Sequence, residues 1–130
     1  MQTKMLAPSR DCLAPDGSEI RLLTATERGS SVHCTLPPGM VSLAVAHHNV
    51  EEIWYFLQGR GQLWRKLGAR EKIVGVSEGM SVTIPAGAHF QFRNTGTEPL
   101  RFVLTTMPPW PGEEEAYRVE DHWMAAESPL

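Results

Sequence analysis

No apolar run in the sequence approaches the ~20 residues that a membrane helix requires, which argues against a membrane span. Residues 1–6 carry one lysine and lack the apolar core of a signal peptide, so we expect a cytoplasmic protein. Positive charge is also scarce, because 12 lysines and arginines face 15 acidic residues and are dispersed along the chain. A net charge of −3 gives no overall attraction for phosphate groups, and nucleic acid is therefore not an expected partner.

Cysteine pairs and helical periodicity are absent as well. The two cysteines, Cys12 and Cys34, are far apart and form no CxxC pair, which argues against a zinc knuckle and a redox dithiol. No apolar pattern with a 3.6-residue period occurs before residue 110. Residues 112–124 favour a helix, because successive glutamates suit a helix N-terminus, but their weak apolar face fits an irregular tail equally well.

Short strand-like segments separated by turns fill the rest of the chain. Glycine, proline, aspartate and asparagine mark the turns, and the segments between them are rich in β-branched and aromatic residues. We expect strands at 19–24, 32–36, 41–46, 53–57, 62–66, 72–76, 81–84, 90–93 and 100–105. Short strands at this spacing predict an all-β sandwich or barrel, and 130 residues fit one domain with one core.

Two stretches of the sequence reproduce the spacing of the paired motifs of the cupin superfamily. The first family motif reads G, five residues, H-x-H, three or four residues, E, six residues and G. The second reads G, five residues, P-x-G, two residues, H, three residues and N. The matching residues here are Gly39, His47, Glu52 and Gly59 in the first motif, and Gly79, Pro85, Gly87 and Asn94 in the second. The chain therefore resembles a cupin over about half of its length.

The resemblance implies a fold and a cofactor. Cupins form a double-stranded β-helix, or jelly-roll barrel, whose interior takes a small molecule. We accordingly expect a single cupin domain over 1–130, with a barrel core at about 19–106 and a short irregular or helical tail at 107–130. In metal-binding cupins the motif histidines and the glutamate surround one divalent transition metal, such as iron, manganese, nickel or zinc.

The sequence departs from this ligand set at two of the four positions. His47 and Glu52 match ligand positions, whereas Val45 and Phe90 occupy the other two and cannot bind a metal. A shorter spacing of the first motif pairs His48 with Glu52, and it also lacks the first histidine. The family pattern alone therefore leaves the metal site incomplete.

His89 decides between two interpretations of the site. It precedes the expected ligand position by one residue, and strand alternation turns such a residue outward unless a bulge after Gly87 redirects it. In the first interpretation, His47 or His48 joins Glu52 and His89 in a three-ligand metal site. In the second, no metal binds, and His47 and Glu52 form a hydrogen-bonded pair in an apolar cavity.

Glu52 is the candidate catalytic residue in both interpretations. A carboxyl group directed into an aromatic pocket is partly desolvated, which raises its pKa unless a cation or a hydrogen-bond donor offsets the effect. Glu52 then acts as a general acid or base, and a purely structural pairing with an arginine or a histidine is the alternative. The residues expected to line the ligand site are Trp54, Phe56, Phe90, Gln91 and Phe92.

Two functions remain open at this stage. One is a metal-dependent enzyme of the dioxygenase, isomerase or lyase type that acts on a small organic substrate. The other is a non-catalytic, metal-free module that binds or senses a metabolite. We also expect a homodimer, because edge strands need cover. Trp110 and Trp123 are expected to cover an opening, a subunit interface or the barrel core, and the glutamates at 113–115 to form a solvated face.

Overall fold

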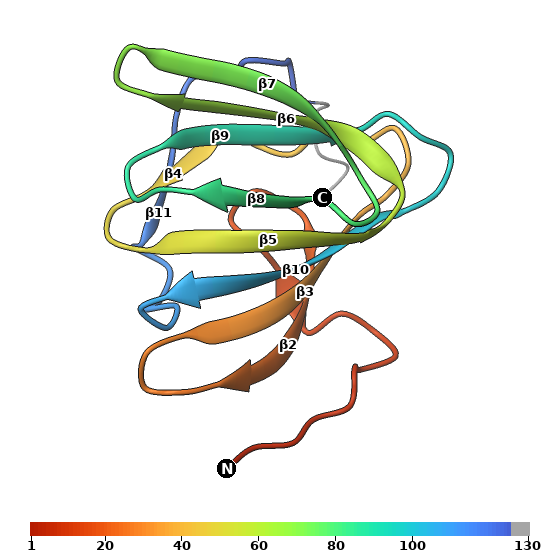
Figure 1. Ribbon diagram of the computed structural model, residues 1–130, viewed down its shortest axis with the longest axis vertical. Coiled ribbons are helices and arrows are strands. Elements are labelled where there is room, and N and C mark those ends of the chain that lie inside the picture. The colour runs from red at the N-terminus through yellow and green to blue at the C-terminus, as the bar shows by residue number, and fades with distance from the viewer. Residues whose placement is uncertain (126–130) are drawn as a thin grey trace.

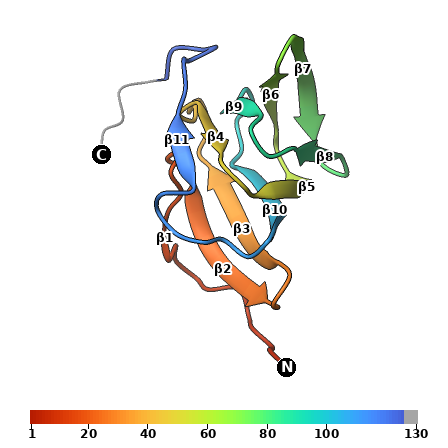
Figure 2. The same ribbon diagram turned by 90° about the vertical axis from the view of Figure 1, so that its left-hand side faces the viewer.

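In the computed structural model, which describes residues 1–125, antiparallel strands form two sheets that wrap around one core (Figures 1 and 2). The six-stranded sheet has the order β1 (Cys12–Leu13), β2 (Glu19–Ala25), β3 (Ser30–Leu36), β10 (Leu100–Met107), β5 (Glu51–Gln58) and β8 (Ser81–Ile84). The five-stranded sheet has the order β11 (Ala116–Arg118), β4 (Val45–His47), β9 (His89–Asn94), β6 (Arg60–Leu67) and β7 (Arg70–Ser77). The described residues form no helix, and hence none that is long and apolar enough to cross a membrane.

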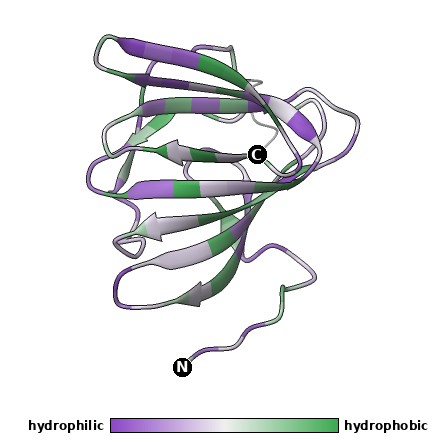
Figure 3. Ribbon diagram, viewed as in Figure 1, coloured by the Kyte–Doolittle hydropathy of each residue, from purple (hydrophilic) through white to green (hydrophobic). Residues whose placement is uncertain are grey.

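The period-two alternation of strand side chains fixes which residues face the core. In β5, Glu52, Trp54 and Phe56 are buried, whereas every residue between them is exposed. Strand β8 repeats this pattern, with Val82 and Ile84 inward. Figure 3 shows the same feature as hydrophilic and hydrophobic bands that follow one another along the strands. Glu52 is therefore carried into the barrel by the same register that buries two large aromatic rings.

Aromatic rings from three strands fill the centre of the core. Trp54 stacks on Phe102 with ring centroids 4.4 Å apart, and Phe92 meets the two rings edge-on at 5.2 and 5.4 Å. Phe56 packs on Phe102 at 5.0 Å and meets Trp54 edge-on at 6.1 Å. Such offset and edge-to-face pairs add to the stabilisation from burial. This packed cluster closes the barrel behind Trp54 and leaves the interior in front of it open.

Three motif glycines adopt a backbone conformation that other residues rarely take. Gly39, Gly59 and Gly79 all have positive φ, at 75°, 85° and 90°. At Gly59, between β5 and β6, a Cβ atom would lie 2.6 Å from the carbonyl oxygen of Pro99. Because other residues rarely adopt this φ and have no room there, a side chain would strain the β5–β6 hairpin.

Strand prediction fails mainly at the two ends of the chain and at 41–46. Strand β4 covers only Val45–His47, and Val41 makes an isolated bridge to Arg93. β1 pairs with β2, and β11 adds an edge strand to β4 where a helix or an irregular tail was expected. Glu115 is buried rather than solvated, because its carboxylate accepts hydrogen bonds from the backbone N–H groups of Asn49 and Val50. The last part of the expected tail, 126–130, lies outside the described residues.

Candidate functional site

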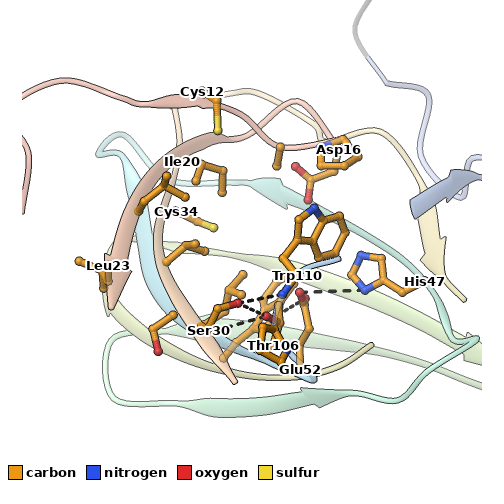
Figure 4. A pocket seen from close by; sticks show the side chains of 18 of the residues that line it. Cys12, Asp16, Ile20, Leu23, Ser30, Cys34, His47, Glu52, Thr106 and Trp110 are labelled. Atoms are coloured by element: carbon orange, nitrogen blue, oxygen red, sulfur yellow. Dashed lines mark hydrogen bonds and ion pairs between the residues drawn. The ribbon is translucent and has the colours of Figure 1, made fainter. Parts of the chain in front are cut away.

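A cavity of about 460 Å³ lies inside the barrel, in front of the aromatic cluster. Residues from both sheets line it, together with the turn before β2 and the segment that follows β10 (Figure 4). Most of the wall is apolar, and a few polar side chains reach into it, a composition and size typical of small-molecule sites. Among these polar side chains are Asp16, Ser30, His47, Glu52 and Thr106.

Glu52 is held in the wall by its own strand. The indole Nε1–H of Trp54, two residues along β5, donates a 2.9 Å hydrogen bond to Glu52 Oε1. Only 5% of the Glu52 side chain is exposed, and burial raises its pKa to about 8, with a smaller contribution from Asp16. The hydrogen bond from Trp54 offsets only part of this shift. With this pKa, Glu52 is mainly protonated at pH 7.

His47 lines the same cavity and faces Glu52. Its Nδ1 atom is 4.0 Å from Glu52 Oε2, which is too long for the hydrogen bond expected from the sequence. The ring meets Phe90 and Trp110 edge-on at 5.3 and 5.1 Å, and its Nδ1 has no hydrogen-bond partner among the described residues. Burial lowers the pKa of His47 to about 4, although Glu115 acts in the opposite direction. The imidazole is therefore neutral at pH 7.

Asp16 is a second buried carboxyl group in the cavity, and the sequence analysis missed it. It sits in the turn between β1 and β2, where Gly17 has a φ of 90°, and its side chain is 9% exposed. Its Oδ1 accepts hydrogen bonds from the backbone N–H and the hydroxyl of Ser18, at 2.9 and 2.6 Å. Burial nevertheless raises its pKa. The Asp-Gly-Ser sequence indicates a turn, but nothing in it shows that the carboxyl group faces the core.

Trp110 covers one side of the cavity. Its backbone N–H donates a 3.0 Å hydrogen bond to Ser30 Oγ, which shares a 2.6 Å hydrogen bond with the hydroxyl of Thr106. Thr106 pairs with Glu52 across β10 and β5, so this polar group adjoins the candidate catalytic carboxyl. Trp110 was expected to cover an opening, a subunit interface or the barrel core, and the structure places it in the wall of the cavity.

The structure does not bring the other candidate metal ligands to this cavity. His48 follows the last residue of β4, is exposed, and packs on Tyr117 with ring centroids 4.4 Å apart. His89 begins β9 opposite Lys66 and is absent from the cavity lining, as strand alternation predicts. In residues 1–125 there is no group of three His, Cys, Asp or Glu side chains that could hold a metal.

Of the predicted ligand-binding residues, only Trp54 and Phe90 line the cavity. Phe56 and Phe92 belong to the aromatic cluster instead, where both rings pack edge-on against Trp54 in the core. Gln91 points to the opposite side of β9 from the cavity. Its amide oxygen accepts hydrogen bonds from the backbone N–H groups of His122 and Trp123 in the C-terminal segment. Its amide nitrogen donates to the carbonyl oxygen of Trp123 in that segment and to that of Ser42, which precedes β4. Gln91 is therefore a structural anchor.

The donor set does not fit the metal centre of the cupin family. Only His47 and Glu52 face one another in the cavity, and Val45 and Phe90 fill the two remaining ligand positions, paired across β4 and β9. One imidazole and one carboxyl group at 4.0 Å leave most coordination positions of a transition metal without a protein ligand. The arrangement instead offers two neutral polar groups at the wall of an apolar cavity.

Comparisons with known proteins agree with this fold. An uncharacterised protein of Methanocaldococcus jannaschii is 30% identical over 107 residues, which cover 78% of this chain and 82% of that protein. Mannose-1-phosphate guanylyltransferase of Escherichia coli is 28% identical over 102 residues, but the chain spans only 21% of that enzyme.

Among solved structures, oxalate decarboxylase from Bacillus subtilis superposes with a TM-score of 0.74 at 20% identity, over 88% of this chain and 31% of that one. An uncharacterised protein of Klebsiella pneumoniae with a double-stranded β-helix domain gives a TM-score of 0.66 at 18% identity, over 84% and 91% of the two chains. At such identities the likeness concerns the fold. The sequence profile of the cupin domain matches residues 32–106, which is more than half of the chain. With both sheets and both motifs in place, the protein belongs to the cupin family.

Proposed function

We propose that this cupin binds a small organic molecule in the cavity beside Glu52 and His47, without a resident transition metal. The observation that carries the proposal is the pair of facing atoms His47 Nδ1 and Glu52 Oε2, which lie 4.0 Å apart. One ligand hydroxyl or amino group at a hydrogen-bonding distance of about 2.8 Å from each atom fits this separation. The apolar wall formed by Val45, Trp54 and Phe90 accepts the rest of the molecule.

A cavity-filling substitution tests the binding site. Val45 lines the cavity and is buried, so Val45→Phe places a ring where the ligand would lie. Val103→Phe is the matched control, because Val103 alternates with the inward residues Phe102 and Leu104 and is absent from the lining. Ligand-observed NMR with a set of small alcohols, ketones and amines should detect binding to the wild type and to the control. We expect Val45→Phe to weaken it at least about tenfold. Equal binding by both variants, or no binding to the wild type, contradicts the proposal.

Elemental analysis tests the metal-free part of the proposal. Protein purified without added metal is expected to hold far less than one equivalent of iron, manganese, nickel or zinc, because two donors bind such ions weakly. A stoichiometric metal that is lost in both His47→Ala and His89→Ala would contradict it. That result would mean that the cavity rearranges to bring His89 to the ion.

A second candidate function is proton-transfer catalysis of the isomerase or lyase type, with Glu52 as the general acid. The specific observation in its favour is a carboxyl group whose pKa of about 8 lies close to neutral pH, beside a neutral imidazole. Glu52→Gln keeps an oxygen that accepts the Trp54 hydrogen bond but cannot donate or accept the transferred proton. Loss of turnover by about 100-fold or more is expected for any substrate found. Unchanged turnover in this variant would remove Glu52 from the reaction.

A further inference from the structure

Two carboxyl groups from distant parts of the chain share the cavity. Asp16 comes from the turn before β2, and Glu52 comes from β5. Both side chains are at least nine-tenths buried. In Figure 4 the two groups occupy different sides of the cavity, with the indole of Trp110 drawn between them. Burying one carboxyl group without a partner is costly, and burying two in one space is more so.

The cavity contains no cationic side chain to balance these acids. No lysine or arginine is among its lining residues, and neither carboxyl group forms an ion pair with one anywhere in residues 1–125. The imidazole of His47, 4.0 Å from Glu52, is uncharged at pH 7. Burial keeps Glu52 mainly protonated in the empty cavity, and an ammonium group beside it would favour the ionised carboxylate, with its proton released to the solvent.

The rest of the wall also suits a cation carried on an apolar body. Trp54, Phe90 and Trp110 line the same cavity, and the faces of aromatic rings attract ammonium groups, particularly where water is excluded. A ligand of this kind needs an apolar body to contact most of the wall and a cationic group to contact its few acidic side chains. An anionic guest would meet two acids and no positive charge.

We propose that the ligand of this cavity is a small organic monocation, an amine on an apolar body, with Glu52 and Asp16 as its acidic partners. This inference rests on the proposed function, since it names the class of molecule that the same cavity binds. One positive charge matches the site better than two, because two buried carboxyl groups in one cavity oppose each other's ionisation.

Three probes with one apolar ring test the proposal: cyclohexylmethylamine, cyclohexylmethanol and cyclohexanecarboxylate. Calorimetric titration of the wild type at pH 7.5 should give an affinity for the amine at least about tenfold higher than for the alcohol, with no detectable binding of the carboxylate. Glu52→Gln and Asp16→Asn should each lower the affinity for the amine at least about fivefold, and by a clearly larger factor than the affinity for the alcohol. The exposed neighbour variant Glu51→Gln should match the wild type.

The outcomes separate this inference from the proposed function. Equal affinity for amine and alcohol, or preferential binding of the carboxylate, overturns the cationic ligand while the cavity remains a binding site. If none of the probes binds and the broader fragment set also fails, both are overturned. Asp16→Asn keeps an oxygen that can accept the Ser18 hydrogen bonds. The comparison of the three probes on the wild type also decides the question even if this variant does not fold.

Discussion

The buried carboxyl group of Glu52 should make the protein less stable as the pH rises, and Glu52→Gln should remove this dependence. The folded state keeps a proton on Glu52 up to a pKa of about 8, whereas the unfolded chain releases it near the ordinary value of 4.5. Between these values the native state binds more protons than the unfolded state, so the free energy of unfolding falls as the pH rises. Over the three pH units from 5 to 8, the loss relative to the variant is at most about 4 kcal/mol.

Urea unfolding followed by tryptophan fluorescence between pH 5 and pH 9 measures this loss directly. Comparing wild type with Glu52→Gln cancels the contribution of His47, whose lowered pKa makes the folded state more stable as the pH rises from about 4 to 6.5. Glu51→Gln, on the exposed side of β5, is the control and should follow the wild type. Parallel pH profiles for wild type and Glu52→Gln would refute the burial argument, because they would show that Glu52 titrates alike in the folded and unfolded states.

Three further predictions concern other parts of the molecule. The free energy of unfolding of the wild type should fall by up to about 3 kcal/mol between pH 6.5 and pH 4 because of His47, and in His47→Gln this fall should be absent in the same unfolding assay. Gln91→Ala leaves several backbone groups of the C-terminal segment without partners and should lower the free energy of unfolding by roughly 2 kcal/mol, with faster hydrogen exchange at the amides of His122 and Trp123 as the local readout. The expected homodimer stays a prediction: Ile53, Tyr55 and Leu57 are 38–47% exposed on one face of β5, and Tyr55→Glu should shift a dimer to monomer in analytical ultracentrifugation if that face is the interface.

Local sequence signals were sufficient to predict most of the barrel. Turn residues and period-two alternation located the strands. Alternation also favoured an outward His89, but a bulge that would bring it to a metal site stayed open until the cavity lining was known. The same signal placed Glu52 inside, where burial raises its pKa as expected. Motif spacing identified Val45 and Phe90 as the residues that replace metal ligands, and the structure pairs them across β4 and β9.

The remaining features depend on contacts between distant segments. Alternation shows that Phe56 and Phe92 face inward but not how deep along the barrel they lie, so the sequence could not separate the packed cluster from the cavity wall. Gln91 was misassigned because the C-terminal segment covers the outer face of β9 and buries its amide. Asp16 reaches the cavity from a turn, and the direction of a turn side chain is set by tertiary packing rather than by periodicity.

The indole N–H resonances of the four tryptophans test the location of the ligand site most directly. Trp54 and Trp110 line the cavity, whereas Trp64 and Trp123 contact the C-terminal segment and Arg93 away from it. In ¹H–¹⁵N spectra recorded during titration with cyclohexylmethylamine, the resonances of Trp54 and Trp110 are expected to shift in a saturable manner while the other two stay in place. Shifts confined to Trp64 and Trp123 would show that small molecules bind elsewhere and would contradict the cavity as the functional site.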